Sequence, residues 1–246
     1  MKRLYEKSEI WFAIAWIIAY CFFLSLGDNI SVSIGLINVA TFPIALLLSF
    51  VLFFFLKKNG LLEAYGLCKS KVPASKVLFY IPVVVMLTAN LWYGIGIYVS
   101  PVEAICYVLT MLCVGFLEEV IFRGLLFNVM RKDGVKSAIL VSSLTFGMGH
   151  IINLFNGSGT ELLPNLLQVV YATAAGFMFV MIYYRTESLI VCIVTHGVFN
   201  ALSIFVNEAA VTDTMQILSC LFLIVVCGGY AAYLAKGKNV RSERGD

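Results

Sequence analysis

The feature that most constrains the fold of this chain is a series of apolar runs, each near the length needed to cross a bilayer. A spanning α-helix needs about 20 apolar residues to cross roughly 30 Å of hydrocarbon. Continuous apolar character argues against the alternating pattern of a membrane β-barrel. The sequence therefore predicts an all-α polytopic membrane protein with about eight transmembrane helices. The runs are 10–26, 34–56, 77–99, 104–128, 137–155, 163–184, 188–206 and 215–235.

Composition indicates one membrane-embedded helical domain, residues 1–246, with no room for a soluble domain. Apolar residues make up 61% of the chain and charged residues 13%. Soluble domains are only about 45–50% apolar. The seven cysteines are odd in number, scattered and without a CxxC spacing. This pattern argues against a disulfide framework and against a zinc knuckle.

The basic residues predict the orientation of the helices. If the N-terminus is cytoplasmic, sixteen of the seventeen Lys and Arg residues fall in cytoplasmic segments, and only Arg123 lies inside a helix. An excess of Lys and Arg in cytoplasmic segments is the usual rule for membrane proteins. Both termini are therefore predicted to be cytoplasmic, and the net charge of +3 reflects topology rather than a nucleic-acid partner. The outer loops hold only the acidic residues Asp28, Glu103, Glu161, Glu208 and Asp213.

Ionisable residues inside the apolar runs predict a functional site. Glu118, Glu119 and Arg123 lie within the run 104–128, and the only two histidines, His150 and His196, lie within two other runs. Each charge at the membrane centre costs about 2.5–3.5 kcal/mol, and such residues are functional by default.

The predicted topology also places these polar residues at similar depths. At 1.5 Å per residue, Glu118 and His150 lie about 18 and 21 Å from the cytoplasmic ends of their helices. On the same scale, His196 and Asn200 lie about 15 and 21 Å deep. We therefore expect three helices to build one site near the membrane centre.

Helical spacing indicates different roles for the two carboxylates. Glu119 and Arg123 are four residues apart and should form a pair. Glu118 is rotated by about 100° around the helix and can face a cavity. A carboxylate in such a cavity is suited to act as a general base for water. His196 and Asn200 are also four apart, and both can donate hydrogen bonds to a developing oxyanion.

The sequence does not decide whether the site uses a metal cofactor. Catalytic zinc uses three protein ligands and an open position. No HExxH motif is present, although His150, His196 and a glutamate would supply three ligands. The cofactor is therefore either a divalent metal such as zinc or none.

Three motifs, in this order, resemble those of the CAAX protease and bacteriocin-processing family (CPBP, also called ABI) of intramembrane endopeptidases. They are Glu118-Glu119-x-x-x-Arg123, Phe146-x-x-x-His150 and His196-x-x-x-Asn200. The resemblance covers about residues 104–206, which we expect to be the catalytic core.

The resemblance implies a mechanism and a substrate class. Glu118 and His150 would activate a water molecule, His196 and Asn200 would hold the oxyanion, and Glu119 and Arg123 would organise the site. The family is called a metalloprotease family, but the glutamate mechanism needs no zinc ligand set. The implied substrate is a membrane-associated peptide or a (prenylated) protein.

Two other functions stay open on the sequence alone. The family includes members linked to bacteriocin self-immunity, so one alternative is a non-catalytic membrane binding, immunity or export-accessory protein. A transporter is the other, but its polar residues should line a path through both halves of the membrane, and here they form one layer. We expect an integral membrane protein of a bacterial plasma membrane, with the endoplasmic reticulum as the alternative location.

Overall fold

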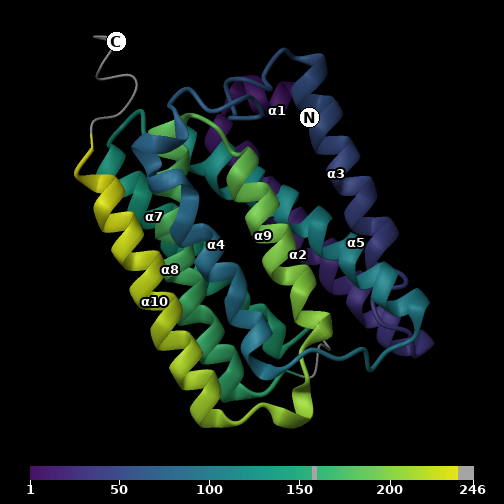
Figure 1. The fold of residues 1–246 in the computed structure, drawn as a ribbon. Helices are drawn as coiled ribbons and strands as arrows, with labels where there is room; N and C mark the ends of the chain where they lie inside the picture. The colour runs from purple at the N-terminus through teal and green to yellow at the C-terminus, as the bar shows by residue number, and fades with distance from the viewer. Residues whose placement is uncertain (157–159, 238–246) are drawn as a thin grey trace.

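The computed structural model describes residues 1–156 and 160–237, which form a helical bundle (Figure 1). Within these residues, seven helical segments are long and apolar enough to cross a membrane, and an eighth apolar helix, Ile190–Phe205, is shorter. The prediction of an all-α polytopic membrane protein is therefore confirmed. The α-helices are α1 (Lys2–Lys7), α2 (Glu9–Ile34), α3 (Thr41–Lys58), α4 (Ile81–Leu87), α5 (Pro101–Glu118), α6 (Asn128–Met130), α7 (Val135–Gly149), α8 (Leu162–Thr186), α9 (Ile190–Leu202) and α10 (Asp213–Ala235).

Shorter helical segments connect or extend these elements. The π-helix η3 (Glu119–Phe127) continues α5 directly into α6. The 3₁₀ segments are η1 (Ala74–Tyr80), η2 (Thr88–Tyr93), η4 (His150–Leu154), η5 (Ser203–Phe205) and η6 (Glu208–Ala210). Along the bundle α8 packs between α7 and α10, α5 packs against α9, and α3 packs against both α2 and α5 (Figure 1).

Apolar side chains cover the outside of the bundle as well as its core. Phe22, Leu47 and Val225 are each more than half exposed, and many other large apolar side chains are also exposed. Contiguous exposed apolar surface of this kind marks a membrane or protein contact. This exposed apolar surface is consistent with a bundle surrounded by lipid.

The first two predicted helices have different bounds in the structure. Helix α2 runs to Ile34 rather than residue 26. Gly27, which we expected to end the helix, instead lies inside it at the point where α2 crosses α3. A Cβ on Gly27 would come within 2.8 Å of the Thr41 Cα atom. The hydroxyl of Thr41 also donates to the Asp28 carboxylate at 2.8 Å, which gives this polar residue a partner inside the helix. Helix α2 ends at Gly35 in the left-handed conformation (φ +77°), and α3 begins only at Thr41.

The predicted helix 77–99 is shorter and less regular than expected. Helical segments end at Tyr93, and Gly94 (φ +82°) turns the chain out of the helix. Beyond it the backbone pairs with the segment after α9: Gly96 donates to the Phe205 carbonyl at 2.8 Å, and Asn207 donates to the Gly94 carbonyl at 3.2 Å. The sequence is apolar enough to span, but these glycines favour an extended turn at the end of the bundle.

The two ends of the bundle differ in charge, as the topology prediction requires. At one end Lys132 pairs with Glu9 at 2.6 Å and Arg131 pairs with Glu187 at 3.1 Å, which joins segments predicted to be cytoplasmic. The N-terminus and the yellow end of α10 lie at this same end (Figure 1). We call it the basic end. The predicted cytoplasmic residues Lys238, Arg241 and Arg244 lie outside the described residues.

Cysteine labelling will test which side of the membrane the basic end faces. In a cysteine-free background, Lys2→Cys and Lys236→Cys should resist a membrane-impermeant thiol reagent in intact cells, because both lie at the basic end. Both should react after permeabilisation. Labelling of either position in intact cells would contradict the N-in orientation.

Candidate functional site

The paired carboxylates lie where α5 changes into a π-helix. All nine residues of η3 are buried, and Glu118 and Glu119 occupy the junction. π-Helical turns occur frequently at functional sites. Their widened winding alters the backbone hydrogen bonding, and here Ser142 of α7 donates its hydroxyl to the Phe122 carbonyl at 2.9 Å. Ser142 therefore has a structural partner in the π-helix.

The predicted pair of Glu119 and Arg123 is present and fully buried. Arg123 Nη1 lies 3.0 Å from Glu119 Oε1, and both side chains have no exposed surface. The guanidinium Cζ atom also lies 4.0 Å from the centre of the Phe146 ring and 5.6 Å from that of Phe179. A desolvated cation over an aromatic face gains about 2 kcal/mol. Arg123 is thus held between a carboxylate and two rings.

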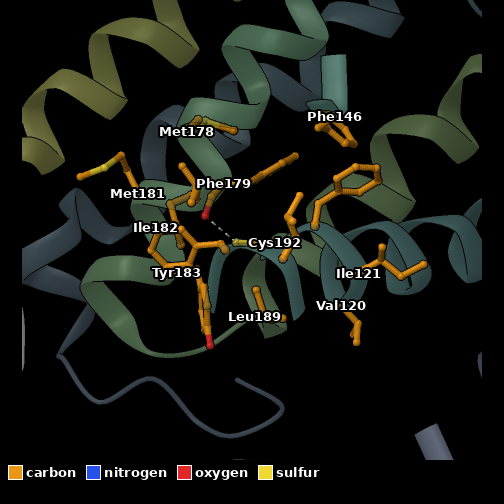
Figure 2. Close-up of a cluster of buried hydrophobic side chains, with 14 of the residues drawn as sticks. Val120, Ile121, Phe146, Met178, Phe179, Met181, Ile182, Tyr183, Leu189 and Cys192 are labelled. Atoms are coloured by element: carbon orange, nitrogen blue, oxygen red, sulfur yellow. Dashed lines mark hydrogen bonds between the residues drawn. The ribbon is translucent and has the colours of Figure 1, made fainter. Parts of the chain in front are cut away.

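His196 of α9 joins the two glutamates. Its Nδ1 atom lies 2.8 Å from Glu119 Oε1, and its Nε2 atom lies 3.3 Å from Glu118 Oε2. The imidazole ring stacks on Phe179, with 5.6 Å between ring centres. Phe179 belongs to a cluster of buried apolar side chains, where the Cys192 thiol donates to the Phe179 carbonyl (Figure 2).

Two glycines allow α5 and α9 to approach closely enough for these contacts. A Cβ added to Gly115 would lie 2.5 Å from the backbone nitrogen of Gly197 and 2.7 Å from its Cα atom. Gly115 precedes Glu118 by one turn, and Gly197 follows His196 directly. Small residues let helix backbones approach closely within membranes. The glycine contact therefore sets the distance between the glutamates and the histidine.

Substitution of Gly115 should separate the two helices. Gly115→Ala is expected to destabilise the protein by roughly 1–3 kcal/mol, because added volume in a packed contact forces backbone shifts. Gly228→Ala in α10 is the matched control, since a Cβ there meets nothing within 4 Å. The midpoint of thermal unfolding in detergent measures both. Equal midpoints for the two variants would show that the close approach is not needed.

Tyr20 of α2 is a site residue that the sequence analysis missed. Its hydroxyl donates to Glu118 Oε1 at 2.5 Å, across 98 residues of sequence. A tyrosine in an apolar helix carries no motif, so only the packing of α2 against η3 reveals this contact. The other Glu118 oxygen, Oε2, is buried and has no hydrogen-bond partner among the described residues.

His150 and Asn200 lie on the wall of a cavity that reaches Glu118. The cavity has a volume of about 1000 Å³, and its lining includes Tyr20, Glu118, His150 and Asn200. The His150 Nδ1 atom lies 3.1 Å from the Phe146 carbonyl oxygen, so this nitrogen is the donor and Nε2 is left as an acceptor. Three of the four predicted catalytic residues thus share one cavity.

His196 differs from the other three predicted residues in its surroundings. It does not line the cavity and is buried behind Glu118 and against Phe179. Asn200 is one turn further along α9, where Asn90 donates to the Phe199 carbonyl at 2.6 Å and fixes the end of the helix beside the cavity. His196 and Asn200 lie on one face of α9, as predicted. His196 lies at the buried charges, and Asn200 lies on the cavity wall.

The described residues do not assemble a metal site. Within 1–156 and 160–237, no group of three or more His, Cys, Asp or Glu side chains is placed to hold a metal ion. Both nitrogens of His196 face carboxylates, and Nδ1 of His150 faces a carbonyl. This donor arrangement does not fit a three-ligand zinc site. The side chains at this site are therefore placed to bind one another rather than a zinc ion.

Comparison with known protein families identifies a similar family. Residues 99–202 match the model of the type II CAAX prenyl endopeptidase Rce1-like family, and they contain all six predicted site residues. The resemblance drawn from the three motifs is therefore confirmed. No curated protein and no solved structure matches the chain significantly. The family match and the apolar helices together support a membrane-embedded endopeptidase in general terms.

Proposed function

We propose that the protein is an intramembrane endopeptidase that hydrolyses a peptide bond with a water molecule activated by Glu118 and His150. The observation that carries this proposal is the state of the Glu118 carboxylate. One oxygen accepts the Tyr20 hydroxyl, and the other is buried with His196 Nε2 3.3 Å away but no hydrogen bond among the described residues. Glu118 also lines the cavity that meets His150 and Asn200. A buried unsatisfied acceptor costs about 1–3 kcal/mol. A water that reached this buried oxygen from the cavity, after a small movement of the Glu118 side chain, would relieve this cost and would lie where a base is needed.

The proposed reaction begins with that water. It donates hydrogen bonds to Glu118 Oε2 and to Nε2 of His150, and Glu118 takes one of its protons as the water oxygen bonds to the carbonyl carbon. The carbonyl oxygen becomes an oxyanion. When the carbon–nitrogen bond breaks, the proton on Glu118 passes to the departing amine. The products are one new carboxyl terminus and one new amino terminus.

The oxyanion is assigned to Asn200 and His196. The side-chain amide of Asn200 has two N–H donors on the cavity wall. His196 Nε2 lies 3.3 Å from Glu118 Oε2, which has no aligned hydrogen bond, while Nδ1 is engaged by Glu119. Donation by His196 to the oxyanion would therefore require its Nε2 atom to turn from Glu118 Oε2 toward the cavity.

The remaining two site residues have a positioning role in this proposal. Glu119 binds both Arg123 and His196, so it fixes the ring that stands beside Glu118. Neither Glu119 nor Arg123 lines the cavity. They neutralise and orient the groups that do react.

The substrate in this proposal is a membrane-associated peptide or protein, with a prenylated chain as the type that the family description suggests. The lipid bilayer is the protein's other partner. We propose that it is an integral protein of a bacterial plasma membrane, with the endoplasmic reticulum as the alternative, and that the reaction proceeds without a metal. Comparison of membrane peptides by mass spectrometry, from cells with parental protein and with Glu118→Gln, would identify the natural substrate.

Hydrolysis by the purified protein tests the proposed function. In liposomes it should cleave a quenched fluorescent prenyl-peptide, and Asn200→Ala should be about 10²–10³-fold slower, because loss of one oxyanion donor usually costs that much. Chelator titration should leave the parental rate unchanged. A rate for Asn200→Ala equal to the parental rate would remove Asn200 from the mechanism. Absence of turnover, together with complete function in cells, would favour a non-catalytic binding or immunity protein.

A further inference from the structure

Among the described residues, the lining of the cavity at Glu118 extends toward one end of the bundle and not toward the other. From Glu118 and His150 its lining continues to the end opposite the basic end, through the α2–α3 connection and the segment after α9. Asn38, Tyr98 and Ala209 belong to this outer part of the lining. No lining residue comes from the loop 59–73 or from the turn 186–189.

The basic end is closed by the loop 59–73, which is tied to the turn between α8 and α9. Leu189 donates its backbone N–H to the Gly66 carbonyl at 2.8 Å, and Lys71 donates to the Thr186 carbonyl at 2.9 Å. The Ser188 hydroxyl donates to the Cys68 carbonyl at 2.6 Å. A ligand that approached Glu118 from this end would have to break these contacts and pass the buried residues of η3, which include Arg123.

The opposite end has a defined rim. The pairing of residues 94–96 with 205–207 holds two connections together there. Asn156 donates to the Asp28 carboxylate at 3.3 Å, and Asn29 donates to the Asn156 carbonyl at 3.2 Å. The opening is therefore bordered by two fixed contacts: the pairing of residues 94–96 with 205–207, and the hydrogen bonds between Asn156 and α2.

The charges on the cavity wall indicate which kind of peptide the cavity would bind. Among the described residues that line it, three carry carboxyl groups, Asp28, Glu118 and Glu208, and none is a lysine or an arginine. Aromatic side chains, including Phe122, Phe146 and Tyr171, line its deeper part. Clefts lined by one sign of charge concentrate ligands of the opposite sign. The wall suits a peptide with apolar and basic residues and disfavours an acidic one.

We infer that the cavity is entered from the extracytoplasmic side, and that it takes a membrane-anchored peptide segment with basic residues near the bond to be cut. Of the substrates in the proposed function, this selects the membrane-associated peptide over the prenylated chain, whose lipid is attached in the cytoplasm. The inference rests on the proposed function and on the positive-inside orientation of the basic end. A basic segment would approach the acidic rim from outside the cell, and its apolar residues would reach the aromatic part of the wall beside Glu118.

Labelling at the rim can test this inference without any turnover. In a cysteine-free background, Ala209→Cys reports on the cavity mouth and Lys69→Cys reports on the loop at the basic end. Both positions are exposed. In sealed right-side-out membrane vesicles, an impermeant maleimide should react with Ala209→Cys, and with Lys69→Cys only after permeabilisation. The reverse pattern would place the cavity mouth in the cytoplasm and overturn the inference.

Protection from the maleimide tests the peptide class. An acylated lysine-containing peptide should slow labelling of Ala209→Cys about tenfold more than its glutamate-containing counterpart, in line with electrostatic focusing. Protection should weaken as salt is added. Equal protection by both peptides, or protection by neither, would overturn the assignment to a basic peptide. Preserved protection without any hydrolysis would reject the proposed protease function and leave this inference standing.

Discussion

Replacement of Glu118 by glutamine is expected to reduce hydrolysis to near the background rate. Glutamine keeps the shape of the side chain and can still accept the Tyr20 hydrogen bond, but it cannot take a proton from water. Among the described residues that line the cavity, Glu118 is the only carboxylate in the deep part, since Asp28 and Glu208 lie toward the mouth. The measurement is the cleavage rate of a quenched peptide by purified protein in liposomes.

A second carboxylate provides the control for Glu118→Gln. Glu6 is exposed and pairs with Lys2, at 3.6 Å, within α1. Glu6→Gln should therefore cleave at the parental rate, and both variants should unfold near the parental midpoint. If Glu118→Gln cleaved as fast as the parent, the catalytic assignment would fail and a binding role would replace it.

Removal of the Arg123 side chain is expected to give the largest loss of stability. Within the described part of the chain, Arg123→Ala leaves the fully buried Glu119 carboxylate with His196 as its only remaining partner. Breaking a buried ion pair by removing one partner typically costs about 3–5 kcal/mol. The loss of the ring contacts with Phe146 and Phe179 adds to this cost. Folded yield and the thermal unfolding midpoint in detergent measure the effect.

The exposed pair of Lys132 and Glu9 is the matched comparison for Arg123. Its two atoms lie 2.6 Å apart, closer than those of the buried pair, but the Lys132 side chain is 59% exposed. Surface ion pairs contribute about 0.2–1 kcal/mol, so Lys132→Ala should change stability little. Adding Glu119→Gln to Arg123→Ala should restore part of the loss, because it removes the stranded charge. Equal midpoints for Arg123→Ala and the parent would reject the pairing argument.

The sequence predicts the parts of this structure that follow from hydrophobicity and helical spacing. Long apolar runs predict spanning helices because the bilayer fixes their length, and the pairing of Glu119 with Arg123 follows from i,i+4 spacing. The common depth of Glu118 and His196 predicts a meeting of two helices, and the structure places their side chains 3.3 Å apart.

The features that the sequence does not predict depend on tertiary contacts. Tyr20 reaches Glu118 only because α2 packs on η3, and Gly115 and Gly197 are ordinary residues until two backbones meet. The end of α2 was misplaced because Gly27 and Asp28 resemble a loop, although a helix crossing and a hydrogen bond keep them helical. The π-helix has no local sequence signal, because its nine residues are apolar or belong to the charged motif.

A cavity that is open at one end and closed at the other also changes where the membrane voltage acts. If the basic end faces the cytoplasm, as predicted, water and ions in such a cavity carry the electrical potential of the outer solution down to Glu118, so the voltage drop falls mainly across the closed basic end. A charge that crosses the full field changes in energy by about 2.3 kcal/mol per 100 mV. A basic peptide that binds in the cavity crosses little of this field. Its affinity should therefore depend on salt rather than on how strongly the membrane is polarised.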